Sequence, residues 1–379
     1  MKPEASSAVS NADEMSGIAR SDAAEGGARL NTQPLFRLMV EKRASDLFFT
    51  SYAPVKIKID GQIFPVNKQV LTPDMVRETA YGLMTPEQIR YFEEELEIDF
   101  ALSAPGLGRF RVAVFHQRGY PAIVLRYVTA DMPKLEKLGL PAVINDLSLL
   151  RRGLVLMVGA TGSGKSTTLA AMINHRNESV SDHILTIEDP IEFLHTNKRS
   201  IINQREIGLD TKSLHRALRS AMRAAPDVVM VGEIRDRESM RAAITLAGTG
   251  HLCIATLHAN NAAEALDRII NLFPREEHAQ VLLDLSQYLK AILAQRLVRG
   301  GEGRHAAVEI LLNTPHMQDL IRAGDTVAVK EALQSSTERG MQCFDAALTE
   351  LVRAERITLE EALKAADSRA NLEARIGFR

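Results

Sequence analysis

Residues 159–166 have the types and the spacing of a loop that binds phosphate. They read Gly-Ala-Thr-Gly-Ser-Gly-Lys-Ser and match the pattern Gly-x-x-x-x-Gly-Lys-Ser/Thr. Glycines allow positive φ, so backbone N–H groups can turn towards phosphate oxygens. Lys165 would reach the β- and γ-phosphates and Ser166 would bind Mg²⁺, whereas the alternative is a chance Gly/Ser turn. The predicted nucleotide-binding residues in this stretch are Gly159, Ala160, Thr161, Gly162, Ser163, Gly164, Lys165, Ser166 and Thr167.

A carboxylate follows a second apolar segment. Residues 228–231 are Val-Val-Met-Val, and Gly-Glu233-Ile-Arg-Asp236 comes directly after them. In a parallel sheet, this carboxylate would lie at the same edge as the phosphate loop. Glu233 could then orient Mg²⁺ or polarise an attacking water. The alternative is that the carboxylate caps the next helix, a role that suits Asp236.

A second acidic group is Glu188-Asp189-Pro-Ile-Glu192, which places three carboxylates within five residues. Such carboxylates repel one another unless a cation lies nearby. A bound Mg²⁺–phosphate group would relieve that repulsion. A solvated acidic loop is the alternative.

Two histidines bracket the apolar segment 252–257. A histidine at a strand end near bound nucleotide can sense the γ-phosphate by hydrogen bonding. His251 precedes the segment and His258 follows it, where the chain leaves the strand. The position of His258 favours a functional role more than that of His251. Either residue could instead be a hydrogen-bonded core histidine.

The elements that position these residues alternate between strand and helix from residue 142 onward. Apolar strands are predicted at 154–158, 183–188, 228–232 and 251–257, with helices of about ten residues or more between them. This rhythm predicts parallel strands joined by crossover helices. After Leu266 the pattern becomes mostly helical to the end. The last helix is predicted to open at Thr358, with Glu361 completing a capping box.

The residues before position 142 have a different character. Residues 33–130 mix short helices with strands at 47–50, 55–59, 63–66, 98–103, 109–116 and 122–127, which predicts a small α+β domain. The predicted organisation is a flexible tail at 1–32, this domain at 33–130, a linker at 131–141, a nucleotide-binding domain with a helical C-terminal part at 142–370 and a tail at 371–379. A partner-docking arm is the alternative for the first tail.

The composition disfavours several classes of protein. Lys plus Arg is 46 against 48 Asp plus Glu, only 5% of residues are aromatic and none is Trp, so a nucleic-acid partner is not expected. Cys253 and Cys343 are isolated, so we expect neither a disulfide framework nor a zinc site. No apolar run approaches the roughly 18–20 residues of a membrane span, and no export signal is visible. We therefore expect a cytoplasmic protein.

Four motif-like segments follow one another along the chain: Gly-Ala-Thr-Gly-Ser-Gly-Lys-Ser-Thr-Thr, Ile-Glu-Asp-Pro-Ile-Glu-Phe, Val-Gly-Glu-Ile-Arg-Asp and Gly-His-Leu-x-x-x-Thr-Leu-His. Over residues 33–370 the chain resembles the type II/IV secretion ATPases in their Walker A, Asp-box, Walker B and His-box motifs. The resemblance implies an α/β fold with a RecA-like P-loop NTPase core, a PAS-like N-terminal domain, ATP and Mg²⁺ as cofactors, and a homo-hexamer. It places the catalytic glutamate at Glu233, the Asp-box glutamate at Glu192 and the His-box histidine at His258.

The same resemblance implies that Arg109, Arg111 and Arg126 reach the nucleotide from the N-terminal domain. The sequence agrees in part, because residues 109 and 111 point to one face of a strand. Surface charge on that strand is the alternative. If they do reach the nucleotide, the site is completed from a second domain.

Within this family the chain is similar to the type IV pilus retraction ATPases of the PilT and PilU type, and more to PilU. The absence of a paired CxxC motif disfavours pilus-extension and type II secretion ATPases. Residues 316–321, His-Met-Gln-Asp-Leu-Ile, replace the Ala-Ile-Arg-Asn-Leu-Ile stretch of PilT. The resemblance implies that ATP hydrolysis drives pilus retraction and twitching, with a PilT-type partner and an inner-membrane platform protein. The alternatives are an adaptor hexamer that supports another motor, and a nucleic-acid motor.

Overall fold

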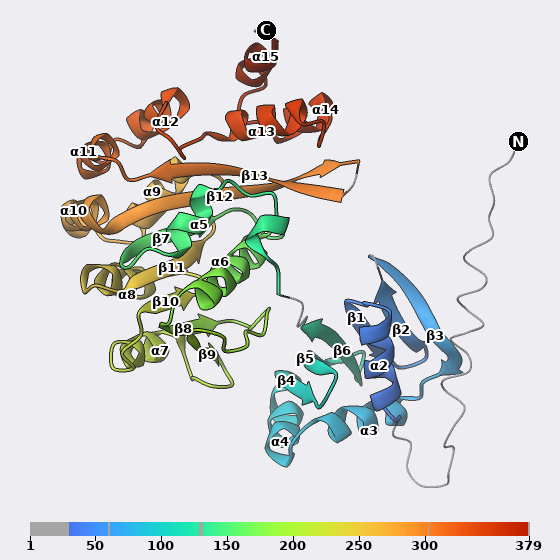
Figure 1. The fold of residues 1–379 in the computed structure, drawn as a ribbon. Coiled ribbons are helices and arrows are strands. Elements are labelled where there is room, and N and C mark those ends of the chain that lie inside the picture. The colour runs from blue at the N-terminus through green and yellow to red at the C-terminus, as the bar shows by residue number, and fades with distance from the viewer. Residues whose placement is uncertain (1–29, 60, 129–131, 302, 378–379) are drawn as a thin grey trace, which may run out of the picture. The chain divides into compact units, whose positions relative to one another are not determined.

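The computed structural model describes residues 30–59, 61–128, 132–301 and 303–377, and the chain divides into two compact units at residues 130 and 131 (Figure 1). Most of the predicted N-terminal tail, residues 1–32, lies outside the described residues. Among the described helices, none is long and apolar enough to cross a membrane.

The N-terminal unit contains a six-stranded antiparallel sheet in the order β3-β2-β1-β6-β5-β4. Its strands are β1 (Asp46–Thr50), β2 (Pro54–Ile59), β3 (Gln62–Val70), β4 (Glu97–Ala104), β5 (Gly108–Gln117) and β6 (Tyr120–Val128). Its helices are α2 (Gln33–Glu41), α3 (Pro73–Leu83) and α4 (Pro86–Glu95). Thr72 and Thr85 cap α3 and α4 ahead of a proline, because each threonine side chain accepts a bond from a backbone N–H in the first turn.

The C-terminal unit contains a seven-stranded sheet in the order β13-β12-β7-β11-β10-β8-β9. Its strands are β7 (Gly153–Val158), β8 (His183–Glu188), β9 (Ile201–Glu206), β10 (Val228–Val231), β11 (Leu252–Leu257), β12 (Leu289–Gly300) and β13 (Gly303–Leu312). From β12 to β9 in this order, each strand is parallel to the next, whereas the edge strand β13 is antiparallel to β12. This arrangement matches the predicted parallel core.

Helices cover both faces of this sheet (Figure 1). The helices of this unit are α5 (Val143–Ser148), α6 (Lys165–Ser179), α7 (Leu214–Ala221), α8 (Arg237–Gly248), α9 (Ala262–Asn271), α10 (His278–Tyr288), α11 (Pro315–Ala323), α12 (Thr326–Ser335), α13 (Phe344–Arg353), α14 (Leu359–Ala365) and α15 (Arg369–Gly377). Helices α5 and α6 pack on one face with alternate residues of β7, and α7 to α10 pack on the other.

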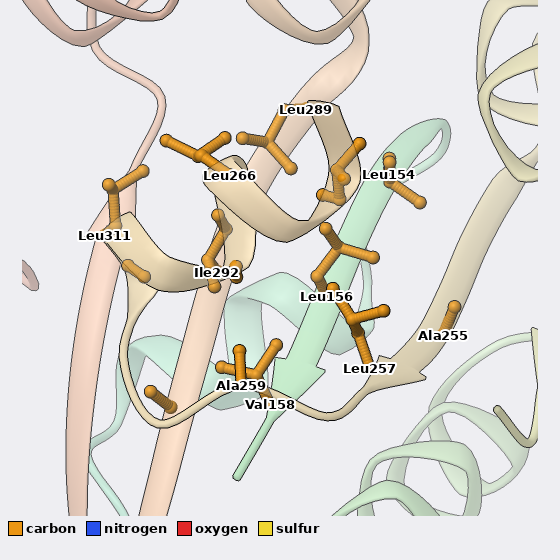
Figure 2. Close-up of a cluster of buried hydrophobic side chains, with 14 of the residues drawn as sticks. Leu154, Leu156, Val158, Ala255, Leu257, Ala259, Leu266, Leu289, Ile292 and Leu311 are labelled. Carbon is orange, nitrogen blue, oxygen red and sulfur yellow. The ribbon is translucent and has the colours of Figure 1, made fainter. Parts of the chain in front are cut away.

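Strand β7 has apolar residues on both faces because both are covered. On one face Leu156 and Val158 join a cluster with Leu257, Leu266 and Ile292, drawn in Figure 2. All five side chains are at most 1% exposed. Full burial of each large aliphatic side chain contributes about 1.5–3 kcal/mol, so this cluster anchors the strand that precedes the phosphate loop.

Two strand regions of the C-terminal unit differ from the sequence-based expectation. The segment after Leu266 contains the long hairpin β12–β13 as well as helices. The segment 201–206, for which no strand was expected, forms the edge strand β9. The run 289–298 does not alternate strictly between apolar and polar residues, so its periodicity does not distinguish a strand from a helix. In the structure this run is a strand because it pairs with β7.

The predicted tail at 371–379 begins inside α15, where Leu372 is fully buried against the core. Thr358 caps α14, since its Oγ1 accepts a bond from the Glu361 N–H at 3.3 Å, but the Glu361 carboxylate accepts from Nζ of Lys364 at 2.7 Å instead of completing the predicted capping box. Helix α14 is also not the last helix, because α15 follows it. In the predicted linker, Leu135 is buried in the same core cluster as part of α6, so the described part of this segment packs on the C-terminal unit.

Candidate functional site

The loop 159–164 lies between β7 and α6, as the sequence predicts. Gly159, Gly162 and Gly164 all have positive φ, at 152°, 79° and 87°. The loop leads directly into the first turn of the fifteen-residue helix α6, which starts at Lys165. The positive end of a helix dipole and its unpaired N–H groups form an anion site. The local geometry is therefore that of a phosphate cradle.

Lys165 lies across this cradle. Its Nζ donates to the carbonyl oxygens of Gly159 at 2.7 Å and Ala160 at 2.9 Å. Burial lowers the pKa of Lys165, while the charges of Glu233 and Glu192 act to raise it. The ammonium group is thus held at the loop, within the electrostatic reach of both predicted catalytic carboxylates.

A cavity of about 620 Å³ opens at the carboxyl ends of the parallel strands. It is bordered by the phosphate loop, by the acidic segment after β8 and by the segments that follow β10 and β11. The predicted site residues that line it are Thr161, Gly162, Lys165, Ser166, Glu188, Asp189, Glu192, Glu233 and His258. Strand polarity brings them together, because all the strands concerned run parallel and end at one edge.

Glu233 is held on both sides. Its Oε1 lies 2.7 Å from Nε2 of His258, and its Oε2 accepts from Nε of Arg235 at 2.7 Å. The bond to Glu233 is the main reason that the pKa of Arg235 is raised. Thr256 donates its hydroxyl to the carbonyl of Gly232, which ties the turn carrying Glu233 to β11. Glu233 therefore has a fixed position on the cavity wall.

The carboxylates at the end of β8 and just after it have different roles. Glu188 is buried and accepts from the hydroxyl of Thr186 at 2.6 Å and from Nε2 of Gln204 at 3.0 Å. Burial raises the pKa of Glu188. Asp189 lies 3.4 Å from Arg235, and Glu192 lines the cavity. Glu188 thus fastens the wall to β9, whereas Asp189 and Glu192 lie beside Arg235 and Lys165.

Two neighbouring residues have structural positions. Asp236 caps α8 by accepting from the N–H of Ser239 at 2.8 Å, which confirms the capping role considered for it. The expectation that His251 binds nucleotide is not supported: His251 precedes β11 and hydrogen-bonds to Thr249 and to the carbonyl of Leu246. The six residues of β11 separate it from the cavity by roughly 20 Å at about 3.3 Å per residue.

Sequence reasoning missed Gln295, a buried side chain on β12 that bonds to the phosphate loop. The sequence feature that could have indicated it is a glutamine followed by Arg296 in the mostly apolar run 291–298. It also missed Arg235 as the partner of Glu233.

Arg111 and Arg126 lie directly opposite each other on β5 and β6, and Arg109 lies two residues before Arg111 on the same face. Core side chains such as Phe110 and Val112 occupy the other face. Arg126 pairs with Asp46 at 2.9 Å and Arg111 with Asp99 at 3.5 Å. The structure therefore groups the three arginines on one face of the N-terminal sheet, and their role towards nucleotide stays a prediction.

The donor set fits Mg²⁺ carried by a nucleotide. Mg²⁺ prefers oxygen ligands and is usually bound by one or two protein groups, several waters and substrate phosphates. Ser166 and Glu233 supply hydroxyl and carboxylate oxygens on the cavity wall. Among the described residues, no cluster of three or more His, Cys, Asp or Glu side chains could hold a metal alone. Ser166 and Glu233 would hold the ion through the ATP phosphates.

This fold and this site define a P-loop NTPase with a RecA-like core. The family model for type II/IV secretion system proteins matches residues 28–364. The chain is 52% identical over 342 residues to the type IV pilus ATPase PilU of Pseudomonas aeruginosa, covering 90% of each chain. It is 42% identical over 329 residues to the pilus retraction ATPase PilT of the same organism, covering 86% of this chain and 96% of that protein.

The solved structure of the pilus retraction motor PilT with bound ADP aligns with a TM-score of 0.86 at 40% identity, covering 91% of this chain and 99% of that one. The chain belongs to the type II/IV secretion ATPases, within the PilT/PilU family, and it is an ATPase. Its identity to PilU exceeds its identity to PilT, which confirms the expected placement.

Proposed function

We propose that this chain is a Mg²⁺-dependent motor that powers type IV pilus retraction and hence twitching motility. The observation that carries the proposal is that Lys165, Glu233, His258 and Glu192 line one cavity together with residues of the phosphate loop. Lys165 and Glu233 are groups of the kinds that ATP hydrolysis uses, namely a lysine at the phosphates and a residue that orients the attacking water. The retraction task is supported by the similarity over most of the chain to PilU and to the retraction motor PilT.

The chemistry follows from charge and position. The helix N-terminus and Lys165 would neutralise charge that develops on the phosphates. Glu233, fixed by His258 and Arg235, would orient the attacking water and accept its proton. Bound Mg²⁺ would supply further neutralisation of the phosphate oxygens. No covalent intermediate is needed, because positioning and electrostatics supply most of the catalysis of phosphoryl transfer.

The mechanical function would require assembly. We propose a homo-hexamer in the cytoplasm that associates peripherally with the inner-membrane pilus machinery through a platform protein. In that ring Arg109, Arg111 and Arg126 would contribute positive charge to bound nucleotide. ATP-driven domain rotation would then be coupled to pilus disassembly.

A second candidate is an adaptor hexamer that binds ATP and mainly supports a PilT-type motor. The higher identity to PilU favours it, as does the sequence His316–Ile321 at the start of α11, which differs from the PilT stretch. In this reading the ATP site is intact, but force comes chiefly from the partner.

The separating experiment measures pilus retraction with this protein as the only motor, then together with a PilT-type partner. An autonomous motor retracts pili alone, and Lys165→Ala abolishes that activity. An adaptor fails alone but supports the partner even as Lys165→Ala. If the wild-type protein neither retracts pili nor changes retraction by the partner, the proposed function is wrong.

A further inference from the structure

Gln295 joins the sheet to the phosphate loop. Its side-chain Nε2 donates to the backbone carbonyl of Ser163 at 2.8 Å, and its Oε1 accepts from the hydroxyl of Thr168 at 2.8 Å. Only 2% of Gln295 is exposed. One amide therefore connects β12 with both the loop and the first turns of α6.

The loop glycines are packed against the same residue. A Cβ at Gly159 would lie 2.6 Å from the carbonyl oxygen of Gln295, and a Cβ at Gly164 would lie 2.7 Å from its Nε2. Real Cβ atoms do not approach so closely. The absence of side chains at 159 and 164 thus lets the loop rest directly on Gln295, in addition to allowing positive φ.

Gln295 is itself well supported. Its neighbours Leu293 and Ala294 are fully buried on opposite faces of β12, which pairs with both β7 and β13. The next residue, Arg296, points to the other face and bonds to the carbonyl of Ala365 at 2.7 Å. The strand is therefore held on both sides, as precise placement of a site requires.

We propose that Gln295 is a positioning residue for nucleotide binding. It acts through Ser163 and Thr168, because it satisfies one loop carbonyl and one helix hydroxyl that would otherwise lack partners in a buried place. This keeps the loop N–H groups and Lys165 directed at the phosphates. The residue is expected to affect binding of the ground state and of the transition state alike, so its loss raises KM more than it lowers kcat.

The test substitutes Gln295→Met, which removes both hydrogen bonds while nearly preserving side-chain length. The matched control is Gln342→Met, since Gln342 donates its Nε2 to the carbonyl of Val308 in the same sheet but does not contact the loop. Affinity for MgADP, KM and kcat for MgATP, and melting temperature are measured for the full chain. We expect at least about a tenfold weaker affinity and a similar rise in KM for Gln295→Met, and less than about a twofold change for Gln342→Met.

Thr168→Val supplies a second arm that keeps the volume of α6 nearly unchanged. We expect it to weaken MgADP binding, and the double variant with Gln295→Met should be no weaker than Gln295→Met alone, because both changes break the same link. Wild-type affinity in Gln295→Met would overturn the proposal. So would equal losses in Gln295→Met and Gln342→Met. If Gln295→Met does not fold, wild-type affinity in Thr168→Val overturns it.

Discussion

His258 Nε2 lies 2.7 Å from Oε1 of Glu233, and this contact joins the ends of two neighbouring parallel strands, β10 and β11. The second carboxylate oxygen of Glu233 is bound by Arg235. The carboxylate is thus confined from two directions by basic groups that come from its own chain. A water that Glu233 orients would have a defined position relative to the phosphate loop.

The first prediction concerns this carboxylate. Glu233→Gln should bind MgATP but hydrolyse it about 100-fold or more slowly, because the amide cannot accept the proton of the attacking water. The matched control is Asp236→Asn, which makes the same change three residues away and keeps a good helix cap. Steady-state phosphate release together with ATP binding tests the pair. Hydrolysis by Glu233→Gln at the wild-type rate would show that another group is the base.

The second prediction compares the two histidines. His258→Ala should lower kcat by about tenfold to a hundredfold, since Glu233 loses one of the contacts that fix its position. His251→Ala should leave kcat within about twofold, because His251 lies at the other end of β11. Kinetics are measured at a temperature where melting curves show both variants folded. Equal losses of kcat in the two variants would contradict the assigned positions.

The parallel core was predictable because its strands are short apolar runs separated by helices, and the carboxyl ends of such strands meet at one edge. That rule placed Glu233 beside the phosphate loop, and Lys165, Glu192 and His258 line the same cavity at this edge. The same rule argues against His251, which stands at the start of its strand. The prediction for His251 considered only that it stands at a strand end, and did not ask which end of β11 faces the nucleotide.

What sequence could not supply is long-range pairing. The run containing Gln295 becomes a strand because β7 offers an unpaired edge, and nothing local in the run reveals that edge. The link from Gln295 to Ser163 spans 132 positions in the chain. In the same way, α15 is ordered by burial of Leu372 and not by strong local helix signals.

The third prediction concerns the attachment of the C-terminal helices. Arg296 bonds to the carbonyl of Ala365 and, at 2.6 Å, to the carboxylate of Asp367, and its guanidinium lies 3.9 Å from the ring centroid of Phe344. Lysine keeps the charge but cannot form this planar set of contacts. Arg296→Lys should therefore destabilise the C-terminal unit by about 2 kcal/mol.

Hydrogen exchange of residues 344–377 measures this change directly. We expect faster exchange there in Arg296→Lys than in the wild type, with little change in α6. Arg299→Lys is the control, because Arg299 lies on the same strand with an exposed side chain. If the two variants show the same exchange, Arg296 does not hold these helices.

The last prediction concerns Glu309, a buried carboxyl on β13 whose Oε1 accepts from the N–H of Ala262 at 2.8 Å. Burial raises the pKa of Glu309 from its ordinary value of 4.5 to about 7; the nearby Asp367 acts in the same direction and Arg296 opposes it. Between these two values the unfolded chain has lost the proton and the folded chain retains it. Folding stability therefore falls as pH rises from about 4.5 to 7, and stays lower above that range.

Glu309→Gln removes this penalty, because the amide oxygen can still accept from Ala262 and has no proton to lose. Each unit of pKa difference corresponds to about 1.4 kcal/mol, so the variant should gain up to about 3 kcal/mol over the wild type at pH 8 relative to pH 4.5. Urea unfolding at a series of pH values measures the difference. Glu331→Gln, on the exposed side of α12, controls for the loss of one charge. A stability difference between Glu309→Gln and wild type that stays constant from pH 5 to 8 would show that Glu309 ionises normally in the fold.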